Sequence, residues 1–137
     1  VLQGYLDGIG DKENKIRDGA VIWHKTGDAG YMDEQGRLWL LGRVDQAIHD
    51  VKGTLYPFCI ECVLDAHFGI RGAILSHKGK RMVVIEENTV NPDDVLKILN
   101  PFHIMSVITI KKIPMDKRHG AKIDYGRLLE KIKSRLS

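Results

Sequence analysis

The most constraining feature of the sequence is a repeated change between strand-like and helix-like patterns after residue 46. Apolar residues recur at helical spacing from Pro57 to Phe68, and a proline suits the first position of a helix. The apolar runs 70–76 and 81–86 flank a Gly-containing turn, which predicts a hairpin. Further expected elements are a helix over 92–100, a strand over 103–113, an irregular basic loop over 114–121 and a helix over 124–136. This order predicts an α+β fold, with a compact mixed sheet flanked by helices, and not a doubly wound sheet.

The first third of the chain reads differently, because turn-forming Gly and Asp residues dominate residues 1–19. A short strand is expected over 20–24, followed by a polar turn over 25–28. Two apolar runs around the turn 33–36 then predict a β-hairpin. A break at 42–45 separates this hairpin from the α+β part and is the predicted domain boundary.

Composition narrows the class of protein. The chain of 137 residues is 43% hydrophobic and 28% charged, which is typical of a globular protein. Its 21 Lys and Arg against 18 Asp and Glu give a net charge of +3, too small to indicate nucleic-acid binding. No apolar run approaches the roughly 20 residues that a membrane span needs. The chain begins with Val1 inside what reads as an ongoing sequence, so we expect a piece of a longer protein without a signal peptide.

The two cysteines, Cys59 and Cys62, form a Cys-x-x-Cys pair inside the predicted helix 57–68. Such a pair can be half of a zinc site or a redox pair, but no His pair with zinc-ligand spacing accompanies it. We therefore expect two core cysteines and no metal site. Two reduced thiols fit a cytoplasmic protein.

Several motifs occur in one order along nearly the whole chain, and together they are far more specific than any one alone. They are Lys25-Thr26-Gly27-Asp28, Gly30-Tyr31, Asp33-x-x-Gly36-Arg37-Leu38, Leu41-Gly42-Arg43-Val44-Asp45, Gly53-x-x-Tyr56-Pro57-x-x-Ile60-Glu61, and Pro114-x-Asp116-x-Arg118-His119-x-Ala121-Lys122-Ile123-Asp124-Tyr125. This pattern resembles the adenylate-forming superfamily of acyl-CoA synthetases, peptide-synthetase adenylation domains and luciferases.

The resemblance implies nucleotide-binding roles for residues before the break. It implies that the Asp28 carboxylate, a strong acceptor, binds the two hydroxyls of a ribose. The alternative is that Asp28 is a turn residue whose side chain accepts hydrogen bonds from its own backbone. It places Arg43 near the ribose and phosphates, where a permanently charged fork is suited; the alternative is a surface ion pair. Asp45 matches the hinge about which two domains swing.

The resemblance gives Lys122 the sharpest role. Acyl-adenylate formation brings a carboxylate against the α-phosphate of ATP, and a cation between these anions offsets their repulsion. In the commoner family pattern, Gly directly precedes this lysine; here Ala121 does, and Lys117 remains an alternative. The segment 49–53 corresponds to a loop used for the thioester step, where Gly53 would let the backbone approach a pantetheine chain. A tight turn that needs positive φ is the other interpretation of Gly53.

The resemblance implies that residues 1–45 are the tail of a large N-terminal adenylation domain and that residues 46–137 are its small mobile C-terminal domain. The resemblance implies that the full-length protein is a ligase, of the kind found in fatty acid metabolism. It would use ATP with Mg²⁺, form AMP, and join a small-molecule carboxylate to CoA. The chain has no Gly-rich phosphate loop, so we expect it to bind no cofactor and to be inactive alone. The alternatives are a ligase that acts on a carrier protein or forms another acyl product, and a non-catalytic α+β binding module.

Overall fold

The structure is a computed structural model and describes residues 15–18, 21–118, 120 and 122–136. The chain divides into two compact units, Val1–Gln46 and Ala47–Ser137.

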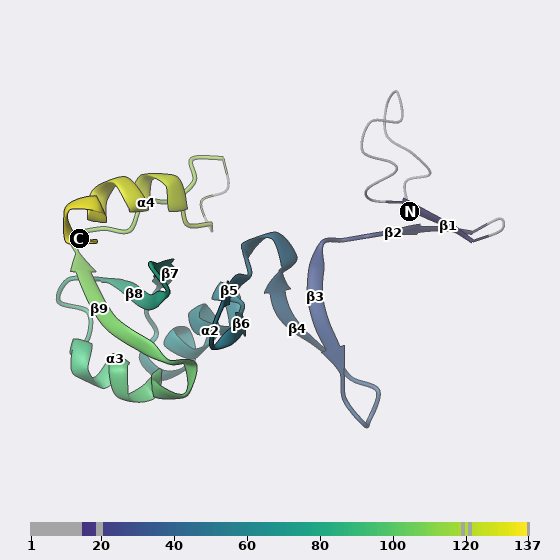
Figure 1. The fold of residues 1–137 in the computed structure, drawn as a ribbon, viewed down its shortest axis with the longest axis horizontal. Coiled ribbons are helices and arrows are strands. Elements are labelled where there is room, and N and C mark those ends of the chain that lie inside the picture. Colours follow the sequence, from purple (N-terminus) through teal and green to yellow (C-terminus); the bar gives the residue numbers. More distant parts are fainter. Residues whose placement is uncertain (1–14, 19–20, 119, 121, 137) are drawn as a thin grey trace. The chain divides into compact units, whose positions relative to one another are not determined.

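In its described residues, the first unit forms two antiparallel strand pairs (Figure 1). Strand β1 (Lys15–Asp18) pairs with β2 (Val21–His24), and β3 (Asp28–Met32) pairs with β4 (Leu38–Arg43). The 3-10 turn η2 (Val44–Gln46) follows β4. The hairpin predicted around the turn 33–36 is present. The prediction of turns alone before residue 20 is wrong for β1, and Asp28 begins a strand where the sequence suggested a turn.

The second unit is the predicted α+β body. Its elements are β5 (Ile48–Asp50), β6 (Gly53–Leu55), α2 (Pro57–Phe68), β7 (Gly72–His77), β8 (Lys80–Glu86), α3 (Pro92–Ile98), η3 (Asn100–Phe102), β9 (Ile104–Ile110), α4 (Tyr125–Ile132) and η4 (Lys133–Arg135). Strands β5 and β6 form a separate antiparallel hairpin. The three-stranded sheet has the order β7-β8-β9, antiparallel between β7 and β8 and parallel between β8 and β9. The mixed sheet flanked by helices is therefore confirmed.

Local signals explain where the helices of the second unit begin and end. Helix α2 starts with Pro57 and ends at Phe68, followed by Gly69, whose φ of 62° is left-handed and suits glycine. Helix α3 starts after Asn91, whose side-chain oxygen accepts a hydrogen bond from the Asp93 amide at 2.9 Å. Helix α4 starts after Asp124, whose carboxylate accepts a hydrogen bond from the Arg127 amide at 3.1 Å.

The sheet of the second unit buries both of its faces. Ile74 of β7 and Val83 of β8 belong to one apolar cluster, to which α2 contributes Ile60 and Leu64 and α3 contributes Val95. The side chains that alternate with them along the strands form a second cluster with α4; its buried members are Ala73, Leu75, Val84, Ile110, Ile113, Leu128 and Ile132. Figure 1 shows α3 and α4 on opposite sides of the sheet. The second unit is thus a three-layer structure.

Three segments at the C-terminal end differ from the predicted boundaries. Strand β9 ends at Ile110 and not at residue 113. The helix predicted over 124–136 is α-helical for Tyr125–Ile132 and then tightens into η4. The loop predicted to be irregular contains a short antiparallel bridge between Met115 and Ile123. None of the helices in the described part of the chain has the length and apolar character needed to cross a membrane.

Candidate functional site

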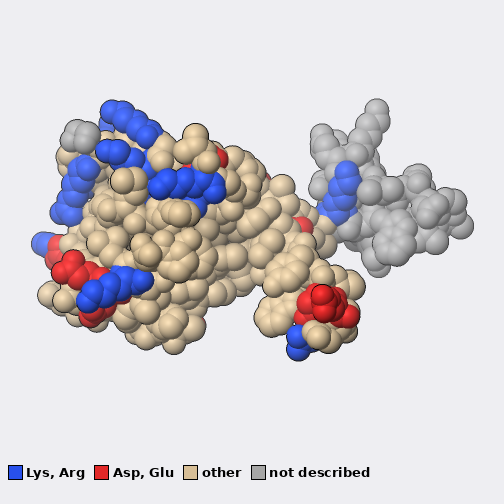
Figure 2. Space-filling model, turned by 60° about the horizontal axis from the view of Figure 1, so that its bottom comes forward, with Lys and Arg blue, Asp and Glu red and all other residues tan. Residues whose placement is uncertain are grey.

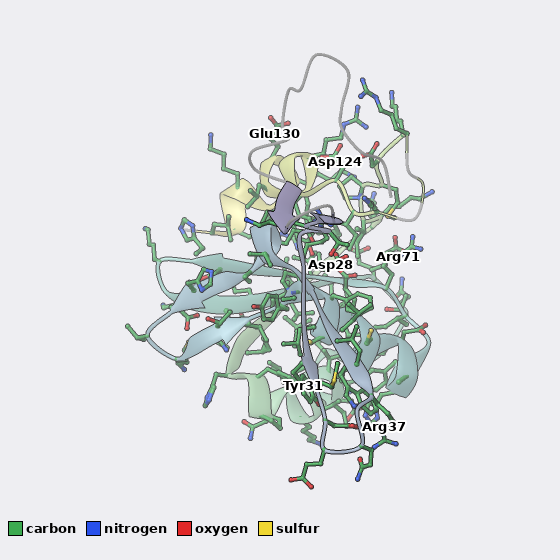
Figure 3. The ribbon with its side chains drawn as sticks, turned by 90° about the vertical axis from the view of Figure 1, so that its right-hand side faces the viewer. Asp28, Tyr31, Arg37, Arg71, Asp124 and Glu130 are labelled. Carbon is green, nitrogen blue, oxygen red and sulfur yellow. The ribbon has the colours of Figure 1, made fainter. Side chains whose placement is uncertain are left out.

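Asp28 and Arg43 lie opposite each other on the β3–β4 hairpin. They are cross-strand partners, and Arg43 Nη1 donates to Asp28 Oδ1 at 3.1 Å. The same nitrogen donates to the Thr26 carbonyl at 2.7 Å. Asp28 lies at the open end of the hairpin, away from the turn that carries Arg37 (Figure 3). Both side chains stay accessible, at 39% exposure for Asp28 and 47% for Arg43.

Gly27 makes room for this guanidinium. Its φ of +80° is in the left-handed region, and a Cβ at this position would lie 3.0 Å from Arg43 Nη2. The Gly27 carbonyl also accepts a hydrogen bond from the Val44 amide at 3.0 Å, which ties the turn to the chain just after Arg43. The turn and the end of β4 therefore fix an exposed carboxylate beside an exposed guanidinium.

Asp45 also lies near the guanidinium of Arg43. It lies in η2, its side chain is 74% exposed, and its Oδ1 is 3.7 Å from Arg43 Nε. Three residues that the sequence analysis assigned to nucleotide binding and to a hinge are thus adjacent. Both interpretations of Arg43 fit this geometry, because an ion pair at the surface can still offer its donors to an anion.

Lys122 lies on a loop that closes on itself at its base. The Asp116 amide donates to the Lys122 carbonyl at 2.8 Å, and the Asp124 amide donates to the Pro114 carbonyl at 2.9 Å. We call residues 115–123, closed by the bridge between Met115 and Ile123, the lysine ribbon. Lys122 and Lys117 are both exposed, so exposure does not distinguish between them. Ala121 and His119 of the motif lie outside the described residues.

Gly53 ends the turn between β5 and β6. Its φ is +110°, and a Cβ there would meet no atom within 4 Å, so backbone conformation and not space requires glycine. Asp50 Oδ1 accepts from the Lys52 amide at 2.9 Å within this turn. His49 Nδ1 lies 3.1 Å from Thr54 Oγ1 across the hairpin. The interpretation of Gly53 as a tight-turn residue is therefore satisfied by the geometry.

Arg81 is a residue of this region that the sequence analysis missed. Arg81 is charged yet buried, and it contacts the turn between β5 and β6. The apolar run of β8 gave no sign that Arg81 is buried, because its carboxylate partner, Asp50, lies 31 positions earlier.

The expectation of two core cysteines is wrong for Cys62. Cys62 is exposed and Cys59 is partly buried, because α2 buries the stripe through Ile60 and Leu64. Partial burial raises the pKa of both thiols, which lowers the fraction of reactive thiolate near neutral pH. In the part of the chain that the structure describes, no three His, Cys, Asp or Glu side chains are placed to hold a metal ion.

Helix α2 also contacts the start of α4 through a polar pair. The Tyr125 hydroxyl donates to Glu61 Oε1 at 3.3 Å. Burial raises the pKa of the Glu61 carboxyl, and burial also raises the pKa of Tyr125. This pair joins the helix that follows the lysine ribbon to the helix that follows the β5–β6 hairpin.

Curated proteins with similar sequences are ligases. A 2-succinylbenzoate–CoA ligase from Enterococcus faecalis is 40% identical over 73 residues, which are 53% of this chain and 14% of the relative. An olefin beta-lactone synthetase from Stenotrophomonas maltophilia is 39% identical over 56 residues, which are 40% of this chain and 10% of the relative. The fatty acid–[acyl-carrier-protein] ligase ScoC from Streptomyces coeruleorubidus is 42% identical over 53 residues, 39% of this chain and 10% of the relative. No family model matches the chain.

Solved structures with the same fold are adenylate-forming enzymes. Apo MatB from Rhodopseudomonas palustris superposes with a TM-score of 0.69 and 25% identity over 98% of this chain and 29% of its own. O-succinylbenzoate coenzyme A synthetase (MenE) from Bacillus subtilis, in complex with ATP and magnesium ion, gives a TM-score of 0.65 and 22% identity over 84% of this chain and 26% of its own. The chain spans less than a third of the length of each of these proteins. The predicted resemblance is thereby confirmed: the chain corresponds to a small, C-terminal-like portion of the adenylate-forming acyl-CoA and acyl-carrier-protein ligases.

Proposed function

We propose that this chain is the C-terminal portion of an AMP-forming acyl-CoA synthetase, which converts a carboxylate, ATP and CoA to acyl-CoA, AMP and pyrophosphate through an acyl-adenylate. In this proposal residues 1–45 end the large adenylation domain and residues 46–137 form the mobile small domain. The observation that carries the proposal is the pairing of Asp28 with Arg43, both accessible, at the position where the motif order requires nucleotide-binding groups.

Asp28 and Arg43 can divide the recognition of a nucleotide between them. Arg43 Nη1 holds the Asp28 carboxylate in place, and the exposed carboxylate can accept hydrogen bonds from two neighbouring ribose hydroxyls. The exposed guanidinium keeps donors for phosphate oxygens. Magnesium, when bound with ATP, supplies further neutralisation of the phosphate charge.

Lys122 would supply the charge that the first half-reaction needs. Two anions, the acid and the α-phosphate, must approach each other, and an ammonium group between them stabilises the charge that develops at phosphorus. The base of the lysine ribbon is held by backbone hydrogen bonds, while the Lys122 side chain is exposed. A ribbon that is fixed at its base and carries an exposed ammonium group suits a lysine that enters the active site for the first half-reaction and then leaves it.

The second half-reaction would follow a swing about Asp45, which brings the 49–53 turn and Gly53 toward the pantetheine thiol. Asp45 lies in η2, directly before the boundary between the two compact units, and its exposed side chain supports the hinge role.

The β3–β4 hairpin supports the proposal that a further domain belongs to the protein. Large apolar side chains on it are 47–67% exposed; they are Tyr31, Met32, Leu38, Leu40 and Trp39. A two-stranded hairpin is marginally stable alone, and apolar side chains of this size are usually buried by other structure. The large domain would cover them, and the chain alone would then make no acyl-adenylate.

A carrier-protein acceptor is the second candidate. The relative ScoC, which is 42% identical over its matched segment, is by its name a ligase for an acyl carrier protein. Both acceptors present the same phosphopantetheine thiol, so the same turn could serve either. Figure 2 shows Lys and Arg side chains along the upper left of the second unit, with Asp and Glu mixed among them at its lower left; the basic part of this face suits an anionic acceptor of either kind.

The test replaces Lys122 by Ala in the full-length enzyme, with Lys117→Ala as the matched control on the same ribbon. We expect Lys122→Ala to slow ATP–pyrophosphate exchange about 100-fold or more, the size of effect seen when one transition-state donor is removed. Thioester formation from supplied acyl-adenylate should be spared, and Lys117→Ala should change neither rate.

Unchanged exchange in Lys122→Ala would refute the assignment of Lys122, and loss of exchange in Lys117→Ala instead would transfer the role. Full-length protein without any exchange activity would refute the proposed function itself. Comparison of CoA with carrier protein as acceptor separates the two candidates.

A further inference from the structure

Arg81 is a buried cation that none of the proposed steps uses. It lies in β8, its side chain is 4% exposed, and that of its partner Asp50 is 6% exposed. Arg81 Nε donates to Asp50 Oδ2 at 2.7 Å and Arg81 Nη2 donates to Asp50 Oδ1 at 2.8 Å. This two-pronged contact is the strongest geometry available to a carboxylate and a guanidinium.

The same guanidinium also contacts two backbone carbonyls. Nη2 donates to the Gly53 carbonyl at 3.1 Å, and Nη1 donates to the Phe102 carbonyl at 3.0 Å. Asp50 and Gly53 are cross-strand partners at the two ends of the β5–β6 turn. Arg81 therefore holds both ends of this turn and joins them to η3.

The position of Arg81 in the sheet favours this arrangement. The pairing of β8 with β9 changes register between Arg81 and Met82. Such an irregularity re-aims the side chain next to it. His103, with a left-handed φ of 57°, ends η3 directly after Phe102 and turns the chain into β9.

Stability alone is a weak explanation for such a pair. Removing two charges from water is costly, and well-packed apolar residues of similar volume often give equal or greater stability. Geometric specificity is the better explanation, because Arg81 uses four donor contacts in a fixed planar fork to fix two points of one turn. The hydrogen bonds from Arg81 hold the pKa of Asp50 below its ordinary value, which keeps the carboxylate charged.

We infer that Arg81 is a positioning residue that sets the backbone of the Asp50–Gly53 turn. Its importance for the thioester step rests on the proposed function, in which this turn meets the pantetheine chain. Arg81 acts through the turn and is not itself expected to touch substrate. Lysine cannot replace it, because one ammonium group cannot reach the Asp50 carboxylate and two carbonyls in this planar arrangement.

The first test is amide hydrogen exchange in the 137-residue chain, read residue by residue. The Arg81→Met variant removes the guanidinium group and keeps an unbranched apolar side chain. The control is Lys80→Met, at the exposed neighbouring position of β8. We expect Arg81→Met to speed exchange of the Asp50–Leu55 amides at least tenfold while the Val84 amide changes by less than threefold. Lys80→Met should leave both unchanged.

A uniform loss of protection across the turn and Val84 would show a general structural role and overturn the inference. Unchanged exchange in the turn would overturn it as well. If Arg81→Met does not fold, Arg81→Lys is measured in its place with the same two readouts and the same interpretation.

The second test separates the half-reactions in the full-length enzyme. Arg81→Lys should slow thioester formation from supplied acyl-adenylate at least tenfold and leave ATP–pyrophosphate exchange within twofold of the wild-type rate. An equal loss in both half-reactions, or no loss in either, would overturn the link to the thioester step. Wild-type enzyme without either activity would refute the proposed function, while the hydrogen-exchange result would still decide whether Arg81 fixes the turn.

Discussion

Gly72 occupies a place in β7 where no side chain fits, and its replacement gives a quantitative test of the packing. A Cβ built at Gly72 would overlap Cδ1 of Leu64, and it would lie 3.3 Å from the Val84 carbonyl oxygen. Leu64 is fully buried, so any movement of its side chain away from the added Cβ displaces other core side chains. Gly72 is paired with Ile85 of the central strand β8, which prevents the backbone from retreating.

The expected cost of Gly72→Ala follows from this overlap. An added methyl group in a well-packed core costs about 1–3 kcal/mol of the free energy of unfolding. Leu64→Ala alone removes the overlapping group but leaves a cavity, at a cost of about 2–5 kcal/mol. In the double variant the methyl group added at position 72 enters that cavity. The double variant should therefore be more stable than the sum of the single effects predicts, by about 1–3 kcal/mol.

Urea denaturation followed by far-UV circular dichroism at the helical band measures these changes. The α-helices that the structure describes all lie in the second unit, so the helical signal reports that unit. With a slope of about 1 kcal/mol per molar urea, an effect of about 2 kcal/mol moves the midpoint by about 2 M. Gly120→Ala is the control, since a Cβ there meets no atom within 4 Å, and its midpoint should stay unchanged. A Gly72→Ala midpoint equal to that of the wild type, or strictly additive effects in the double variant, would refute this account of the packing.

Three further predictions concern polar groups of the second unit. The lowered pKa of Asp50 means that its stabilisation is complete above its ordinary pKa of about 3.8 and is lost as the pH falls through the folded-state value; Asp50→Asn should lose this acid dependence in urea titrations between about pH 2 and 6. The pKa of Glu61 is raised in the folded state, so its effect on the pH dependence is opposite to that of Asp50: the free energy of unfolding falls as the pH rises above about 4.5. Glu61→Gln, which can still accept from Tyr125, should exceed the wild-type urea midpoint at pH 7 and match it at pH 4, and equal midpoints at both values would contradict the sign. Asn91→Ala removes the acceptor for the Asp93 amide and should cost about 1 kcal/mol, measured as a lower midpoint at pH 7.

The sequence predicted those elements whose ends carry their own local signals. Helix α2 runs from Pro57 to Phe68, as expected, because proline and glycine terminate it at both ends. The β7–β8 hairpin was equally visible, since two apolar runs surround Lys78-Gly79. Such features depend only on residues that are close in the sequence, so a sequence pattern can predict them.

Features that depend on a distant partner were not predictable. Strand β1 was missed for a different reason, because it has four residues and only one of them, Ile16, is apolar. The lysine ribbon is closed by a bridge between Met115 and Ile123, which are eight positions apart, and no alternation of apolar and polar residues predicts this bridge. The burial of Arg81 depends on Asp50 and on the Phe102 carbonyl, which only the fold brings together.

The candidate site divides in the same way. The motif order identified Asp28, Arg43, Asp45, Gly53 and Lys122 as candidate site residues, but it contained no information on the ion pair between Asp28 and Arg43. That pair requires the cross-strand register of β3 and β4, including the shift between Ala29 and Gly30. The roles of these residues remain predictions for the full-length enzyme.

The two faces of the sheet are covered unequally. Helices α2 and α3 share the cluster on one face, while α4 and the residues just before it cover the other. The lysine ribbon leads directly into α4 through Asp124, and the backbone hydrogen bonds at its base join the two ends of the ribbon to each other. Because the Lys122 carbonyl is held by the Asp116 amide and not by α4, a partial opening of α4 would leave the base of the ribbon closed and the opposite layer assembled, so this cation keeps its anchor when the last helix frays.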